Sequence, residues 1–291
     1  MLKKYDELEF TDDFMFSKIM YNNPETCKQV LELILNKHVD SIDFLNKQES
    51  QDIRYYSKGV RFDVYIENES AVYDIEMQVK QKDYSPKRCR YYHSMIDISQ
   101  LRKGSSYQSL KESYVIFICK NGVSPLKNEP ICSYQMRCDQ SSDIILNDDS
   151  HTVVVNAKTP YTGPSETVQS FLSYIRTGKA DGTSKLTDEL SKLVKEAKED
   201  KKWSVEYMTL EMKEQEWRAE AKAEGRAEGI AVGKAEGIAV GKAEGIVVGK
   251  AEGIQIGVRQ TVIEMYNKGL LSVSQAAEML KVDQDTFLTM I

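Results

Sequence analysis

Residues 59–80, GVRFDVYIENESAVYDIEMQVK, carry the pattern that most limits the fold of this chain. Apolar or aromatic side chains occupy every second position of two segments: Val60, Phe62, Val64, Ile66, Ala71, Tyr73, Ile75, Met77 and Val79. A period of two is the repeat of a β-strand with one buried face. The pattern therefore predicts a hairpin of two strands, 60–66 and 71–79, joined by a four-residue loop at 67–70.

In the predicted register, Ile66 pairs with Ala71 and Asp63 lies opposite Asp74. The second face of the hairpin then carries three carboxylates close together, from Asp63, Asp74 and Glu76. Like charges that face each other across a sheet are destabilising. Either water screens them on an open face, or a cation neutralises them. Mg²⁺ prefers carboxylate oxygens and keeps several waters, so two acids and a backbone carbonyl are enough to hold it.

The rest of residues 1–200 predicts alternating helices and strands. Helical spacing and start signals favour helices at 12–20, 24–36, 85–102, 166–176 and 186–199. Apolar, β-branched runs favour strands at 114–119, 131–137 and 152–156. A few strands between helices are typical of an α/β domain, with a sheet flanked by helices.

The acidic hairpin also resembles a known nuclease motif. Asp63, followed by Glu76-Met77-Gln78, is similar to the D…(D/E)-x-K signature of the PD-(D/E)XK nuclease superfamily. Asp13-Phe14-Met15-Phe16 before the hairpin and Arg88-Cys89-Arg90-Tyr91-Tyr92 after it resemble one branch. This branch is the Rpn-type recombination-promoting nucleases, also called PD-(D/E)XK nuclease family transposases. The resemblance covers about residues 8–200.

The resemblance implies a PD-(D/E)XK nuclease-like mixed sheet flanked by helices, and Mg²⁺-dependent cleavage of DNA. It implies that Asp63 and Glu76 are metal ligands and that Gln78 orients the attacking water, so all three are predicted to be catalytic. Glutamine stands where the superfamily has lysine, and it offers hydrogen bonds without a positive charge. The metal must then supply nearly all of the electrophilic stabilisation.

Two further acids are predicted as accessory positions of this site. Asp74 lies on the same hairpin face as the predicted ligands. Asp13 matches an N-terminal position of the family, and its alternative role is to cap a helix beside Asp12.

A local basic stretch follows the acidic hairpin. Between Gln78 and Lys103 there are seven basic and two acidic residues, whereas the whole chain has a net charge of −6. Cations beside a metal site suit the phosphates that flank a cleaved bond. We predict DNA contacts from Arg88 and Arg90, and from Tyr92, which lies one helical turn after Arg88. The alternatives are packing of one tyrosine on the sheet and plain solvation of most of the lysines.

A glycine repeat separates the end of the chain from everything before it. From Gly225 to Gly257 every fourth residue is glycine, and the unit GKAEGIAV at 233–240 returns with one change at 241–248. Glycine costs a helix about 1 kcal/mol relative to alanine, so an isolated helix here should be weak. The repeat is either a helix supported by another chain or a low-complexity linker. We predict a nuclease-like domain at 1–200, a helical joining stretch with the repeat at 201–257, and a small helical hairpin at 258–291.

Composition excludes several other classes. The five cysteines form no C-x-x-C pair and only three histidines accompany them, so neither a disulfide framework nor a Cys/His zinc site is indicated. There is no apolar stretch near the ~20 residues of a membrane span and no apolar N-terminal run, which favours a cytoplasmic protein without a membrane partner.

Together these features predict a Mg²⁺-dependent DNA endonuclease, linked by its family to recombination, mobile elements or defence. Its C-terminal α-helical extension, 201–291, is predicted to mediate self-association or regulation. One rival is a catalytically silent DNA-binding or assembly protein that has kept the fold. The other is a scaffold built around the repeat, with the acidic face merely solvated.

Overall fold

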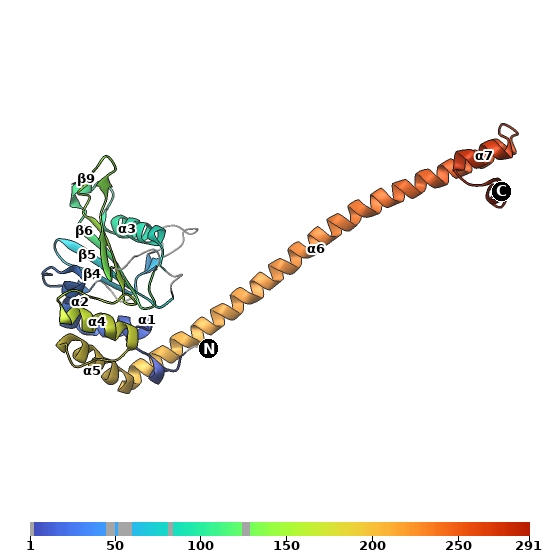
Figure 1. Cartoon of the computed structure of the whole chain (residues 1–291). Coiled ribbons are helices and arrows are strands. Elements are labelled where there is room, and N and C mark those ends of the chain that lie inside the picture. Colours follow the sequence, from blue (N-terminus) through green and yellow to red (C-terminus); the bar gives the residue numbers. More distant parts are fainter. Residues whose placement is uncertain (1–2, 45–49, 52–59, 81–83, 124–128) are drawn as a thin grey trace. The chain divides into compact units, whose positions relative to one another are not determined.

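The computed structural model describes residues 3–44, 50–51, 60–80, 84–123 and 129–291. The chain forms two compact units, Met1–Glu211 and Met212–Ile291. The first unit contains a sheet with its helices, and the second contains most of one long helix and a short helical end (Figure 1). The three-part division predicted from composition, with boundaries at 200 and 257, stays a prediction.

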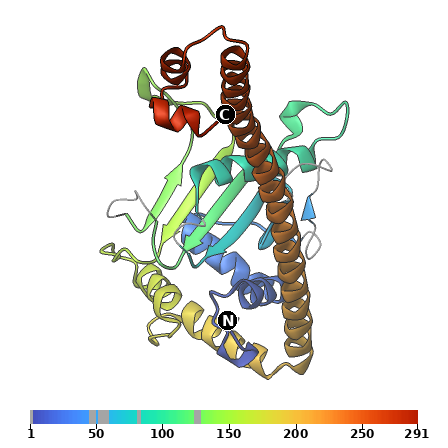
Figure 2. The same ribbon diagram turned by 90° about the vertical axis from the view of Figure 1, so that its right-hand side faces the viewer.

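A six-stranded mixed sheet forms the centre of the first unit, and its strands lie side by side in Figure 2. Their order is β1 (Asp43–Phe44), β4 (Val64–Glu67), β5 (Ala71–Gln78), β6 (Glu112–Cys119), β10 (Ser150–Asn156) and β7 (Ile131–Tyr134). Strands β5, β6 and β10 are parallel, and the outer strands pair antiparallel with them or with β4. Two small ribbons pair β2 (Ser50–Gln51) with β3 (Val60–Arg61) and β8 (Arg137–Cys138) with β9 (Ser141–Ile145).

Five α-helices lie within this unit: α1 (Asp13–Asn22), α2 (Pro24–Leu35), α3 (Pro86–Gln100), α4 (Glu166–Thr177) and α5 (Lys185–Glu199). Two short 3₁₀ helices, η1 (Tyr5–Glu7) and η3 (Tyr107–Ser109), also lie among the residues of this unit that the structure describes. Local signals set several ends, because proline begins α2 and α3, and Gly178 ends α4 in the left-handed region. The predicted α/β fold, a mixed sheet flanked by helices, is confirmed.

The two faces of the sheet bury different sets of side chains. On one face, α1, α2, α4 and α5 cover the alternate apolar residues of β4 and β5, including Val64, Tyr73 and Ile75. On the other face, α3 packs through Cys89, Tyr92 and Ile96 against Val72 and Phe117. The second face of the predicted hairpin is therefore covered by α3, and the hypothesis of an open, solvated face is wrong.

The hairpin forms with its predicted faces, but its predicted register is wrong by two residues. Ile66 pairs with Tyr73, and not with Ala71. The loop is shorter because the side-chain oxygen of Asn68 accepts hydrogen bonds from the amides of Ser70 and Ala71, at 3.0 and 2.7 Å. A shift of two preserves every face, which is why the alternation could not detect it.

The predicted strand 60–66 is interrupted at Phe62 and Asp63, which separate β3 from β4. Phe62 consequently faces α3, where its ring stacks on Tyr65 with centroids 4.9 Å apart, and the prediction that it shares a face with Val64 is wrong. The predicted strand 131–137 also divides, into β7 and β8.

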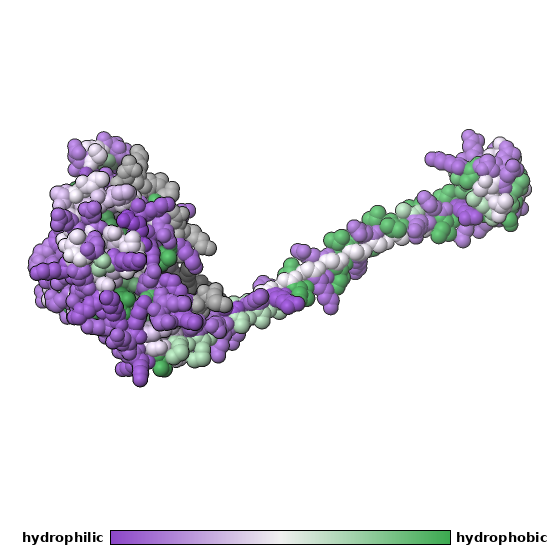
Figure 3. All heavy atoms as spheres, turned by 60° about the horizontal axis from the view of Figure 1, so that its bottom comes forward, coloured by the Kyte–Doolittle hydropathy of each residue, from purple (hydrophilic) through white to green (hydrophobic). Residues whose placement is uncertain are grey.

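The long helix α6 (Lys201–Asn267) includes the whole glycine repeat. In the second unit, α7 (Val273–Leu280) and α8 (Gln284–Leu288) pack against its end through a small core of Val262, Ala276, Ala277 and Phe287. Before that core, apolar side chains wind around an exposed helix (Figure 3). None of the described helices carries an apolar stretch long enough to span a bilayer.

Candidate metal and nuclease site

Asp63 and Glu76 face each other where β4 begins beside β5. The amide of Asp63 donates to Glu76 Oε1 at 3.1 Å, and the amide of Met77 donates to Asp63 Oδ2 at 3.0 Å. Side-chain carboxylates thus take the place of ladder hydrogen bonds at this point, which accounts for the break in the strand. Asp63 is half-buried, and Glu76 has no exposed surface. The corrected register places Asp63 beside Glu76, whereas the prediction had placed it opposite Asp74.

Asp74 lies two residues before Glu76 on the same face of β5 and is completely buried. In the described part of the chain, no donor group forms a hydrogen bond with either of its carboxylate oxygens. An unsatisfied buried carboxylate is costly, so this position favours either a proton or a cation.

One arginine reaches this acidic cluster, which we define as Asp63, Asp74 and Glu76. The guanidinium of Arg88, in the first turn of α3, donates to Glu76 Oε2 at 2.5 Å and to Gln78 Oε1 at 3.0 Å. Gln78 in turn donates from Nε2 to Glu76 Oε2 at 3.3 Å. Gln78 therefore lies between Arg88 and Glu76 and contacts both. Its side chain is buried, with 7% of the residue exposed.

Of the three residues predicted to contact DNA, Arg88 and Tyr92 point toward the acidic cluster, and Arg90 lies on the surface. Arg88 is half-buried and points to the acidic cluster. Tyr92 is buried, with its ring edge-on to Phe62 and its hydroxyl bonded to Arg88 Nε at 2.9 Å. Its burial leaves no face on which a base can stack. Arg90 is exposed, as predicted.

Burial and mutual repulsion change the acidity of the cluster. Burial first, and then the charge of Glu76, raises the pKa of Asp63 well above its usual range. The pKa of Asp74 is raised well above normal by the same two causes, in that order. Burial raises the pKa of Glu76 to about 7, although Arg88 opposes the shift. Without a cation, the cluster therefore takes up protons near neutral pH.

Asp13 is the first residue of α1, and Asp12 occupies the N-cap position, so the capping alternative for Asp13 is wrong. Asp13 is exposed, and its charge adds to the repulsion that raises the pKa of both Asp63 and Glu76. It therefore lies at the solvent side of the cluster. The structure brings together Asp63, Asp74, Glu76, Gln78, Arg88 and Tyr92, with Asp13 at the edge and Arg90 outside.

The cluster suits a hard divalent cation. Within the described ranges, no three His, Cys, Asp or Glu side chains converge as a complete ligand set. Mg²⁺ does not require one, because it is usually held by one or two carboxylates and keeps its waters. The unsatisfied oxygens of Asp74 leave negative charge for a cation to neutralise, and among the described side chains Arg88 is the one base paired with these three acids. Asp63 and Glu76 are the residues that would hold it.

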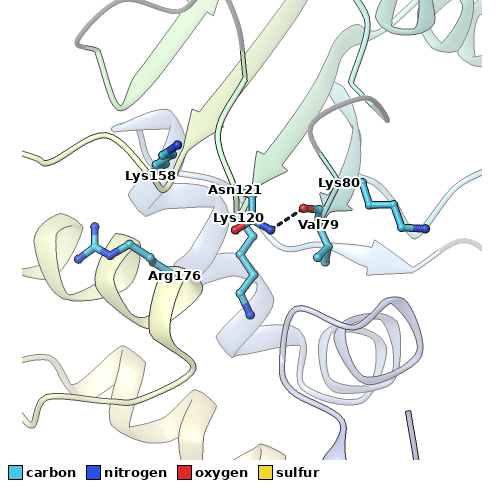
Figure 4. Close-up of a pocket in the computed structure, with 6 residues that line it drawn as sticks. All are labelled: Val79, Lys80, Lys120, Asn121, Lys158 and Arg176. Carbon is cyan, nitrogen blue, oxygen red and sulfur yellow. Dashed lines mark hydrogen bonds between the residues drawn. The ribbon is translucent and has the colours of Figure 1, made fainter. Parts of the chain in front are cut away.

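A basic cleft lies directly beyond the end of β5, and sequence reasoning missed it. It has a volume of about 570 Å³ and is lined by Val79, Lys80, Lys120, Asn121, Lys158 and Arg176 (Figure 4). Its three lysines follow the ends of three parallel strands by one or two residues. The recurrence of lysine just after three of the predicted strands, 71–79, 114–119 and 152–156, was the available signal, but only the strand order makes those lysines neighbours.

The family model for PD-(D/E)XK nuclease family transposases matches residues 11–223. This range is more than half of the 291 residues, and the chain therefore belongs to that family. The matched range contains the acidic cluster, α3 and the basic cleft. No curated protein and no solved structure matches the chain.

Proposed function

We propose that this chain is a Mg²⁺-dependent DNA endonuclease that hydrolyses phosphodiester bonds. The observation that carries the proposal is the pairing of Asp63 with Glu76 across the hairpin, in a member of a nuclease family. Burying these two carboxylates side by side lowers the stability of the folded protein. A purely structural role of the hairpin does not account for that loss. Recombination, mobile-element or defence biology and a cytoplasmic location belong to the same proposal.

Each residue of the site has a distinct part in this mechanism. Asp63 and Glu76 would hold the cation, and Asp74 would add negative charge behind them. When bound there, a divalent cation would supply Lewis-acid stabilisation to the phosphate and would lower the pKa of a water molecule. Gln78 orients the attacking water through its amide, which Arg88 fixes in place. Arg88 supplies, from α3, the positive charge that the superfamily lysine would otherwise provide.

The raised pKa values determine when the carboxyls of the acidic cluster carry protons in this mechanism. With no cation bound, the coupled carboxyls hold protons near neutral pH because burial disfavours their charged forms. A divalent cation favours the charged forms and releases those protons. Cation affinity should therefore increase as the pH rises through about 7, the pKa of Glu76.

A plasmid-nicking assay tests the proposal. The wild-type protein is compared in Mg²⁺ and in EDTA, beside Asp63→Asn, which keeps the shape of the side chain and removes its charge. Asp139→Asn, at an exposed turn between β8 and β9, is the matched control. We expect nicking only in Mg²⁺, and only by the wild-type and control proteins. Equal nicking by Asp63→Asn would contradict the site assignment.

A catalytically silent DNA-binding or assembly protein is the second candidate. The observation that favours it is the 2.5 Å bond from Arg88 to Glu76, because it occupies an oxygen that a metal ligand needs. Glutamine at position 78 points the same way. DNA binding without cleavage at any Mg²⁺ concentration would support this candidate.

We also propose that the repeat in α6 packs against a second copy of the chain. Ten isoleucine and valine side chains between Ile230 and Val258 are 46–69% exposed, and every glycine from Gly225 to Gly257 has open space at its missing Cβ. Near-identical eight-residue units give two copies matching rows of small and apolar positions. The molar mass by light scattering, for the full chain and for a chain ending at Glu211, tests this. Equal, monomeric masses would contradict it.

A further inference from the structure

We infer that the basic cleft at the ends of β5, β6 and β10 binds the backbone phosphates of the DNA strand beside the acidic cluster. The inference rests on the proposed function, because it concerns the substrate of the same site. It moves the predicted DNA path from the face of α3 to the strand-end edge of the sheet.

The topology gathers the basic residues at one edge. Because β5, β6 and β10 are parallel, their carboxyl ends lie together, and this edge is where open α/β sheets bind ligands. Lys80, Lys120 and Lys158 follow these three ends, and Arg176 lies in the last turn of α4. Figure 4 shows Lys158 and Arg176 on one side of Lys120, and Lys80 on the other.

Backbone hydrogen bonds hold the three strand ends in register. The amide of Lys120 donates to the carbonyl of Gln78, and the amide of Ala157 donates to the carbonyl of Cys119, both at 3.0 Å. Gln78 is itself part of the acidic site. The cleft therefore begins within two residues of a group that contacts Glu76, so a polymer can extend from the acidic cluster into it.

Gly122 shapes the turn that follows β6. Its φ of +83° lies in the left-handed region, and an added Cβ would come within 3.2 Å of the Lys158 side chain. The absence of a side chain here leaves room for Lys158 beside the turn.

The cations of the cleft differ in how they are neutralised. Lys120 forms an ion pair with Glu9 at 2.5 Å and a hydrogen bond with Thr11 at 3.1 Å. Lys80, Lys158 and Arg176 are exposed, and none of them forms an ion pair with an acid in the described ranges. Three uncompensated cations in one cleft of a chain with a net charge of −6 favour a polyanionic ligand.

The two sites have complementary chemistry for one polymer. The acidic cluster would repel DNA unless a cation is bound there, so affinity for the strand must come from elsewhere. Cations in an open cleft bind phosphates without reading bases, which suits a sequence-independent grip next to the cleaved bond.

The test compares Lys158→Ala/Arg176→Ala with a matched control, Lys103→Ala/Arg137→Ala, which removes the same charges. Lys103 leads toward the start of β6, and Arg137 follows β7, whose end pairs beside the start of β10. The control residues therefore lie toward the opposite edge of the parallel strands. Fluorescence anisotropy of a labelled 20-base-pair duplex is measured in EDTA, where cleavage is off, over a range of salt concentrations.

Each phosphate contact contributes about 0.9 to the slope of log affinity against log salt. We expect the cleft variant to weaken binding and to reduce that slope by about two, equally for unrelated sequences, while the control keeps the wild-type slope. Equal circular dichroism spectra and melting midpoints establish that the variants are folded. A wild-type slope in the folded cleft variant would overturn the inference and leave the proposed nuclease function standing.

Two further results separate the inference from the proposed function. If the cleft variant loses affinity as expected but the wild-type protein never nicks plasmid in Mg²⁺, the cleft is supported and the endonuclease proposal fails. If the wild-type protein binds inorganic phosphate through Lys158 and Arg176 but does not bind the duplex, the cleft holds a small anion and the inference is overturned.

Discussion

The polar face of β5 and the repeat in α6 both depart from the usual pattern of burial, in opposite directions. The first buries acidic side chains, and the second exposes apolar ones. On β5, Asp74 and Glu76 are charged residues with no exposed surface. Along α6, isoleucines and valines such as Ile238, Ile254 and Val247 are more than half exposed. Charged groups are almost never fully buried unless paired, and exposed apolar rows mark surfaces that bind something.

The comparison teaches that each region lacks a partner of a particular kind. Among the described residues, one arginine faces the three carboxylates of the acidic cluster, so the cluster lacks positive charge. The repeat has nine glycines and every residue from Gly225 to Gly257 is exposed, so its helix lacks burial to offset about 1 kcal/mol per glycine. A divalent cation would complete the first region, and a second copy of the chain would complete the second.

The largest expected effect is on catalysis at the acidic pair. Asp63→Asn and Glu76→Gln should each reduce plasmid cleavage by at least about 10³-fold, because each removes a ligand of the ion that supplies several kcal/mol of transition-state stabilisation. Circular dichroism should show an intact fold for Asp63→Asn, since removing its charge relieves repulsion. Cleavage within threefold of the Asp139→Asn control would mean that β5 buries its acids for another reason.

Gln78 gives the next largest effect. Gln78→Ala should lower the cleavage rate by about 10²-fold, the scale of a positioned catalytic group, because it removes the amide that orients the attacking water and that contacts both Arg88 and Glu76. Gln78→Lys should retain more activity than Gln78→Ala, since its amine can still donate to Glu76. Single-turnover rates in Mg²⁺ measure both variants. An unchanged rate for Gln78→Ala would make the residue structural.

The fold and part of the site could be predicted from the sequence, for identifiable reasons. Alternation of apolar residues identifies the faces of β4 and β5, because a one-residue slip would turn Ile66 and Tyr73 to the face that carries the acidic cluster. It does not identify the register, since the two-residue correction depends on how the Asn68 side chain closes the turn. The break at Phe62 depends on bonds between Asp63 and Glu76 that no periodicity encodes.

Contacts between distant segments account for what the sequence did not show. Arg88 was predicted to contact DNA, and its bond to Glu76 depends on how α3 crosses the sheet. The acidic face is buried for the same reason, because α3 packs over it. Likewise Lys120 and Lys158 lie far apart in sequence and become neighbours because β6 pairs with β10. The order of strands is the information that periodicity lacks.

The pH dependence of stability sharpens the comparison by isolating the buried acids. A folded pKa above the unfolded value means that stability is present at low pH and is lost as the pH rises. For Glu76 this window runs from its ordinary 4.5 to about 7. We expect metal-free Asp74→Asn to gain stability relative to the wild-type protein as the pH rises from 5 to 8, because it removes one raised pKa. Urea unfolding in EDTA measures this gain.

Asp139→Asn is again the control for pH, since its side chain is exposed. It should change stability by the same amount at pH 5 and pH 8. A difference between Asp74→Asn and the wild-type protein that does not vary with pH would show that Asp74 is not held above its ordinary pKa.

The smallest effect concerns single glycines of the repeat. Gly237→Ala should raise the helix stability of α6 by about 1 kcal/mol or less, because alanine loses less backbone freedom. If the glycines contact a second copy, the same change should nevertheless weaken self-association, as seen in sedimentation at several concentrations. Glu236→Ala, the adjacent residue of the same unit, is the control. Unchanged association in both variants would remove the glycines from the interface.

Stabilisation by Mg²⁺ tests the central claim most directly, that the acidic cluster of Asp63, Asp74 and Glu76 holds a divalent cation. The free energy of unfolding is measured at pH 8 against Mg²⁺ concentration, for the wild-type protein and Asp63→Asn/Glu76→Gln. A ligand that binds only the folded state adds about 2.7 kcal/mol at 100 times its Kd. We predict this logarithmic rise for the wild-type protein and a flat response for the variant. The same response in both proteins, or no rise in the wild-type protein, would contradict the account.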